Sequence, residues 1–78
     1  LNVAVHKKYQ NNGFGKKIVS QYLSILPNNS VVFLEVNKNN FIARKIYTSL
    51  NFEKIDLRKN YYNKGEDALI MRYVKNSN

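Results

Sequence analysis

Short apolar runs alternate along this chain with two stretches whose apolar residues recur at helical spacing. Residues 1–5 read as a strand, and residues 13–26 predict an amphipathic helix that Pro27 ends. The helix stripe consists of Phe14, Ile18, Val19, Tyr22, Leu23 and Leu26. Residues 31–36 form an apolar run with a single acid, which is typical of a strand covered on both faces. The order strand, helix, strand favours two parallel, adjacent strands joined by a right-handed crossover, and only a few folds contain this arrangement.

The second half of the sequence predicts another helix and a hairpin. Asn39 or Asn40 can cap this helix, and Asn51 can take the left-handed conformation that closes it. Its expected stripe consists of Ile42, Ala43, Ile46, Tyr47 and Leu50. Residues 52–62 and 68–74 read as strands joined by a turn-rich segment. The expected fold is α/β (α+β), in the order strand-helix-strand-helix-strand-strand, with a parallel first pair and an antiparallel terminal hairpin in one mixed sheet.

Length and composition exclude several kinds of protein. The 78 residues allow a single domain, and residue 1 already lies in what reads as an interior strand, so we expect part of a domain. The chain has no cysteine and one histidine, so we expect no metal site and no disulfide, as in a reducing cytoplasm. No apolar run approaches the ~20 residues that cross a bilayer, and no membrane partner is expected.

The net charge of +8 would attract polyanions, and nucleic acid has to be considered. The basic residues are, however, spread along the chain without an aromatic-plus-basic RNA motif. The compact basic groups, Lys7-Lys8 and Lys16-Lys17, flank a glycine-containing turn. A small phosphate-rich ligand explains this placement better than nucleic acid does, although these lysines could equally form a solvated face.

That turn has the sequence Gln10-Asn11-Asn12-Gly13-Phe14-Gly15, between the first strand and the first helix. Glycine lets the backbone approach a ligand closely, and the N–H groups of a first helical turn have no internal partners. Such a junction can bind a diphosphate. An ordinary strand-to-helix turn would have the same residues.

Five further residues are candidates, each with a plainer alternative. Glu35 is an acid inside an apolar strand, where burial raises a carboxyl pKa and makes it a better base, but it could also face solvent or pair with a lysine. Tyr47 could belong to the core, and Asn40 could be only a cap. Tyr61 and Tyr62 could be strand aromatics that pack across the hairpin.

Four stretches, in this order and at these separations, resemble the C-terminal half of a GCN5-related N-acetyltransferase (GNAT), most closely the RimI-like branch that acetylates protein N-termini. They are Asn2-Val3-Ala4-Val5 with Gln10-x-x-Gly13-x-Gly15; Leu34-Glu35-Val36; Asn40-x-x-Ala43-x-x-x-Tyr47 with Leu50-Asn51-Phe52; and Asn60-Tyr61-Tyr62 with Gly65-Glu66-Asp67-Ala68 and Met71. The resemblance departs at Asn51, where the family usually has glycine. It also implies that residues 1–78 are a single partial domain whose N-terminal half is absent.

The resemblance implies acetyl-CoA as cosubstrate and assigns residues to it. The backbone amides expected at the pyrophosphate belong to Asn11, Asn12, Gly13, Phe14, Gly15 and Lys16, and the residues expected along the pantetheine arm are Val3, Ala4, Val5 and Asn40. By the same resemblance Glu35 is the general base, Tyr47 protonates the departing thiolate, and Tyr61 and Tyr62 hold the acceptor peptide.

The implied reaction is direct attack by an amine on acetyl-CoA in a ternary complex. A protein α-amine has a pKa near 8 and lysine one near 10.4, so a single carboxylate base suits the α-amine of a ribosomal-protein-like substrate better. The alternatives are a CoA-binding module without catalysis and a small basic nucleic-acid-binding domain. The exposed sheet edge at residues 1–5 would also permit self-association, or pairing with the missing half.

Overall fold

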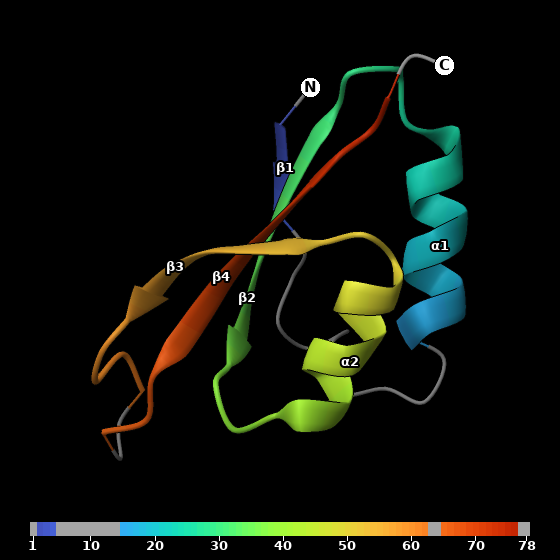
Figure 1. The fold of residues 1–78 in the computed structure, drawn as a ribbon. Coiled ribbons are helices and arrows are strands. Elements are labelled where there is room, and N and C mark those ends of the chain that lie inside the picture. The colour runs from blue at the N-terminus through green and yellow to red at the C-terminus, as the bar shows by residue number, and fades with distance from the viewer. Residues whose placement is uncertain (1, 5–14, 63–64, 77–78) are drawn as a thin grey trace.

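The computed structural model describes residues 2–4, 15–62 and 65–76 of the chain, and these form the elements drawn in Figure 1. In chain order they are β1 (Asn2–Ala4), α1 (Gly15–Ile25), β2 (Val31–Asn37), α2 (Phe41–Ser49), β3 (Glu53–Arg58) and β4 (Ala68–Val74). This is the predicted order of strands and helices. Neither described helix is long and apolar enough to cross a membrane.

The strands form one mixed sheet in the order β1-β2-β4-β3. β1 lies parallel to β2, with Asn2 opposite Val31, and β4 lies antiparallel to both β2 and β3. The predicted parallel first pair and antiparallel hairpin are therefore confirmed. β3 carries a register shift between Lys54 and Asp56, and it forms the sheet edge farthest from β1.

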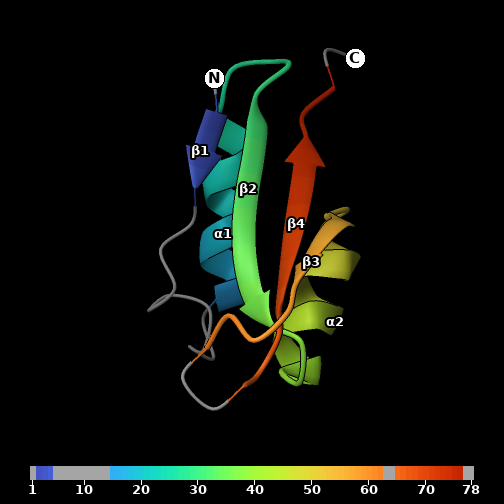
Figure 2. The same ribbon diagram turned by 90° about the vertical axis from the view of Figure 1, so that its left-hand side faces the viewer.

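Both described helices pack on the same face of the sheet, which we call the helix face (Figure 2). Alternate residues of β2 are buried there, because successive side chains of a strand point to opposite sides. The buried residues of the two central strands in this core are Val32, Leu34, Val36, Leu69 and Met71.

The other side of the sheet, the open face, carries Val31, Phe33, Glu35 and Asn37 of β2, and these side chains are only half-buried. The expectation that residues 31–36 are covered on both faces is thus not met within the described residues. The apolar run reflects one packed face and one face that the two described helices leave uncovered.

Helix α1 uses only part of its apolar surface for the core. Val19, Leu23 and Leu26 are buried, whereas Ile18 is 47% exposed and Tyr22 is 37% exposed. The predicted buried stripe of α1 was therefore too broad, because the sheet covers a narrower side of the helix than its apolar residues occupy. Lys75, which follows β4, donates from its Nζ to the carbonyl oxygens of Ser24 in the last turn of α1 and of Leu26 just after the helix.

Helix α2 begins and ends as its sequence predicts. The Asn40 Oδ1 accepts a hydrogen bond from Ala43 N at 3.1 Å, as an N-cap does. Asn51 has a φ of 70°, and the next residue, Phe52, donates its N–H to the carbonyl oxygen of Tyr47. Ile42, expected on the buried stripe, is instead 78% exposed, because only the Ala43 and Tyr47 side of the helix faces the sheet.

Candidate active site

Glu35 lies on the open face of β2, close to the point where the described pairing with β1 ends. Its partner across the antiparallel ladder is Ile70 of β4. On the other side, the described part of β1 pairs only as far as Phe33. Glu35 therefore stands two residues beyond the described parallel pairing, toward the C-terminal end of β2.

The connection between β3 and β4 brings Tyr61 and Tyr62 to Glu35. A hydrogen bond with the Glu35 carboxylate, and then its negative charge, raises the pKa of the Tyr61 phenol, while the nearby Arg58 acts in the opposite direction. The pKa of Tyr62 is also raised, first by burial and then by the charge of Glu35. The two rings meet edge to face at a centroid distance of 5.4 Å. The structure thus groups three of the predicted site residues.

Both tyrosines lie outside the regular strand that was predicted to contain them. β3 ends at Arg58, and Asn60 has a φ of 54°, a conformation that interrupts a strand and that asparagine tolerates. We call the described residues between the strands, 59–62 and 65–67, the tyrosine turn. Sequence periodicity extended the strand through residue 62 because the tyrosines themselves favour strands.

Backbone and side-chain hydrogen bonds shape the tyrosine turn. Tyr62 N donates to Glu66 O at 3.0 Å, and Gly65 N donates to Tyr62 O at 3.1 Å. Gly65 has a φ of 73°, where any other common residue except asparagine or aspartate would be strained. Asn60 N donates to the Asp67 Oδ1 at 3.0 Å. These bonds hold the turn that presents the tyrosines on the open face.

Tyr47 lies on the helix face, on the other side of the sheet from the Glu35 side chain. It is 1% exposed, and its ring packs against that of Phe52 at a centroid distance of 5.5 Å. Burial raises the pKa of its phenol, so the hydroxyl stays protonated at neutral pH, as a general acid must. The side chains of Tyr47 and Glu35 therefore lie on opposite faces of the sheet.

The predicted cosubstrate residues are described only in part. Val3 and Ala4 are in β1, opposite Val32 and Phe33, while Gly15 and Lys16 open α1. Val5, Asn11, Asn12, Gly13 and Phe14 lie outside the described residues. Asn40 caps α2, which is the structural role that the sequence also allowed for it. Its role at a pantetheine arm stays a prediction. In the described part of the chain, no group of three His, Cys, Asp or Glu side chains could hold a metal ion.

The sequence matches a known family model over most of its length. Residues 1–52 match the model of the acetyltransferase (GNAT) family. The chain belongs to the GNAT family. It is 38% identical over 77 residues to the ribosomal protein bS18-alanine N-acetyltransferase of Haemophilus ducreyi, covering 91% of this chain and 53% of that protein. It is 35% identical over 71 residues to the N-alpha-acetyltransferase RimI of Mycobacterium tuberculosis, covering 90% of this chain and 44% of that protein.

Solved GNAT structures have the same fold over nearly all of this chain. The ribosomal-protein-S18-alanine N-acetyltransferase from Escherichia coli superposes with a TM-score of 0.70 at 29% identity, over 95% of this chain and 51% of that one. Arabidopsis thaliana NAA60 in complex with acetyl-CoA gives a TM-score of 0.62 at 25% identity, over 90% of this chain and 43% of that one. This GNAT chain thus spans about half the length of the relatives it matches.

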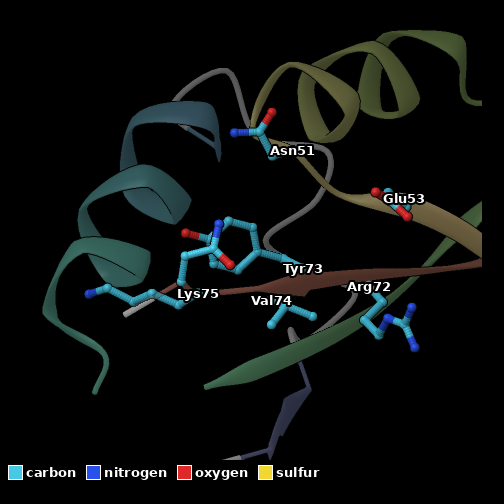
Figure 3. A pocket seen from close by; sticks show the side chains of 7 residues that line it. Asn51, Glu53, Arg72, Tyr73, Val74 and Lys75 are labelled. Carbon is cyan, nitrogen blue, oxygen red and sulfur yellow. The ribbon is translucent and has the colours of Figure 1, made fainter. Parts of the chain in front are cut away.

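A polar hollow of about 610 Å³ lies at the other end of this GNAT chain's sheet and contains none of the predicted site residues (Figure 3). Its lining residues are Asn51, Glu53, Arg72, Tyr73, Val74, Lys75 and Asn76. Two basic residues and one acid line the hollow, and one of the basic residues, Lys75, donates to carbonyl oxygens at the C-terminal end of α1. No sequence motif signals the hollow, because it forms where separate elements end next to each other.

Proposed function

We propose that this chain carries the active-site half of an N-acetyltransferase that moves an acetyl group from acetyl-CoA to the N-terminal α-amine of a protein. The reaction is direct attack by the amine in a ternary complex. The observation that carries the proposal is the grouping of Glu35, Tyr61 and Tyr62 on the open face, beside the end of the described β1–β2 pairing. The names of the GNAT relatives, which acetylate protein N-termini, support the same reaction class.

Glu35 is the proposed base. It accepts the proton that the acceptor ammonium must lose before its nitrogen can form a bond to the acetyl carbon. At pH 7, neutralising a lysine costs roughly 3 kcal/mol more than neutralising an α-amine, because their pKa values differ by about 2.4 units. A single half-buried carboxylate with two neighbouring phenols therefore favours a protein N-terminus as the acceptor.

Tyr47 is the proposed acid, and Tyr61 and Tyr62 are the proposed acceptor-binding residues. The buried phenol of Tyr47 donates a proton to the sulfur as the carbon–sulfur bond breaks. The Tyr61 ring is 47% exposed on the open face, where it can contact a peptide that places its amine at Glu35.

The proposed cosubstrate residues surround the junction of β1 and α1. Backbone amides of residues 11–16 would hold the pyrophosphate of acetyl-CoA, and residues 3–5 with Asn40 would lie along its pantetheine arm. The fit rests on α1 beginning at Gly15, since the first amides of a helix suit an anion, and on Asn40 starting α2. Acetyl-CoA supplies the activated acetyl thioester.

We further propose that the rest of a GNAT domain covers surfaces that this part leaves exposed. On α1, Ile18, Tyr22 and Ile25 recur at helical spacing and are 47%, 37% and 78% exposed. Relatives about twice as long have additional chain to place there. The expectation of a partial domain is consistent with these surfaces.

The test is acetyl transfer by the full-length gene product to a peptide with a free N-terminus. Glu35→Gln and Tyr47→Phe should each lower kcat by about 100-fold or more, the usual contribution of a positioned base or acid. Glu53→Gln, on the open face but on the edge strand, is the matched control and should leave kcat unchanged. Wild-type kcat in both site variants would refute the assignment.

A second candidate is a module that binds CoA without catalysis, which the match to the GNAT family model also allows. Calorimetry separates the two. CoA binding to the full-length product without any acetyl transfer would favour the module, whereas transfer to the peptide would exclude it.

A further inference from the structure

Two links join the C-terminal end of β2 to the tyrosine turn. In the first, Asn37 Nδ2 donates a hydrogen bond to the Glu66 Oε2. The Asn37 Oδ1 accepts from the backbone N–H of Asn39 at 2.9 Å, which fixes the orientation of the amide. Asn37 follows Glu35 by two residues on the same face of β2, so this link starts beside the proposed base.

The second link runs through the neighbouring residues. Lys38 N donates to Asp67 O at 2.8 Å, and the Lys38 ammonium lies 3.9 Å from the Asp67 carboxylate. The other oxygen of that carboxylate accepts from Asn60 N, while Glu66 O accepts from Tyr62 N. The residues on both sides of Tyr61 are therefore bonded to Glu66 and Asp67, which the end of β2 holds in place.

We propose that Asn37 and Glu66 are positioning residues that hold the tyrosine turn over Glu35 and so set the affinity for the acceptor amine. This inference rests on the proposed acetyl transfer. Without the Asn37–Glu66 bond, the end of β2 holds the turn only at Asp67, through Lys38, and the part of the turn on the β3 side depends on a strand that is largely exposed. A turn with few buried contacts opens easily, and the apparent affinity for the acceptor falls by the fraction of molecules in which the turn is open.

Asn37 and Glu66 are partly buried, and neither belongs to the hydrophobic core. Removing the Asn37 amide should therefore move the turn without unfolding the chain. Asn37→Ala removes the donor and leaves the neighbouring backbone bonds in place. Asn39→Ala is the matched control, because Asn39 is exposed and bonds to Asn37 and to Phe41 through its backbone, which alanine keeps.

The kinetic test uses the full-length gene product and a peptide acceptor. Asn37→Ala should raise the KM for the peptide about tenfold, with kcat within about twofold, while Asn39→Ala matches the wild type. Asn37→Asp should raise KM at least as much, since two carboxylates then face each other. Adding Glu66→Gln to Asn37→Asp exchanges donor and acceptor and should restore the wild-type KM, which a loss of general stability would not do.

A second readout needs no activity. The Glu35 carboxylate raises the pKa of Tyr61 and Arg58 lowers it, so NMR titration of labelled tyrosine reports how close the turn lies to Glu35. In Asn37→Ala this pKa should fall toward 10, because the turn moves away from Glu35. An unchanged Tyr61 titration together with an unchanged KM would overturn the inference. Failure of the wild type to acetylate any peptide would refute the proposed function instead, and the titration would still test the link.

Discussion

Lys75 should make a large contribution to the stability of this chain, although it lies outside every helix and strand. Its ammonium donates to Ser24 O at 2.9 Å and to Leu26 O at 2.6 Å, at the C-terminal end of α1. Figure 3 shows the side chain reaching from the end of β4 toward that helix. The last turn of α1 contains no basic residue, so Lys75 supplies the cation from a distant part of the sequence.

The structure allows an estimate of the cost of Lys75→Met, which keeps most of the aliphatic chain and removes the ammonium. A hydrogen bond to a charged group contributes about 1.5–3 kcal/mol, and a cation at a helix C-terminus about 0.3–1 kcal/mol. Because one of the two bonds is exposed, we expect a total loss of about 2 kcal/mol. In the full-length gene product, if it is about twice this length like the relatives, that lowers Tm by about 4–8 °C.

Thermal unfolding followed by circular dichroism measures this loss. Lys54→Met is the matched control, because Lys54 is exposed on β3 and its removal changes the net charge by the same amount. Equal Tm values for Lys75→Met and Lys54→Met would refute the reasoning, since the bonds to the α1 carbonyl oxygens would then contribute nothing beyond charge.

Three other predictions follow from the same structure. Asn51, with a φ of 70°, should tolerate Asn51→Gly but lose about 1 kcal/mol in Asn51→Ala, measured by urea denaturation; equal stability of the two variants would contradict the left-handed closure of α2. Glu35→Gln should lower the pKa of Tyr61 toward 10 in an absorbance titration, because the raising carboxylate is gone; an unchanged titration would show that the two groups are not in contact. Burial raises the pKa of Tyr47 in the folded chain, so its contribution to stability is fully present below pH 10 and is lost as the pH rises through the folded pKa. The wild type should therefore unfold at a lower alkaline pH than Tyr47→Phe. Identical unfolding profiles against pH would contradict this.

The sequence was sufficient to predict structural roles that depend on adjacent residues, such as helix capping. The sequence predicts Asn39 or Asn40 as the cap of α2 and Asn51 as its closing residue. Asn40 is the cap and Asn51 is left-handed, because capping and left-handed conformations depend on a few adjacent residues. The strand character of β2 and the antiparallel hairpin were confirmed for the same reason. The family was also apparent in the ordered motifs, which the match over residues 1–52 confirms.

Apolar periodicity predicted burial wrongly where burial depends on which part of the sheet covers a helix. Ile18 and Ile42 fit their helical stripes but are exposed, because the sheet covers only part of each helix. Tyr61 and Tyr62 have strand-forming side chains, yet they lie in a turn held by Glu66 and by bonds to the distant end of β2. Their position next to Glu35 could not be derived from spacing along the chain.

The sequence by itself determined the order of elements, the helix caps and the membership of the GNAT family, since these depend on local backbone preferences and on motif order. Only the tertiary structure decided that Glu35 meets the two tyrosines on one face of the sheet while Tyr47 is buried on the other. The same holds for Lys75, whose ammonium donates to the carbonyl oxygen of Ser24 in α1, far earlier in the chain. The physical reason is that these contacts join segments far apart in sequence, and strand pairing and helix packing alone bring such segments together.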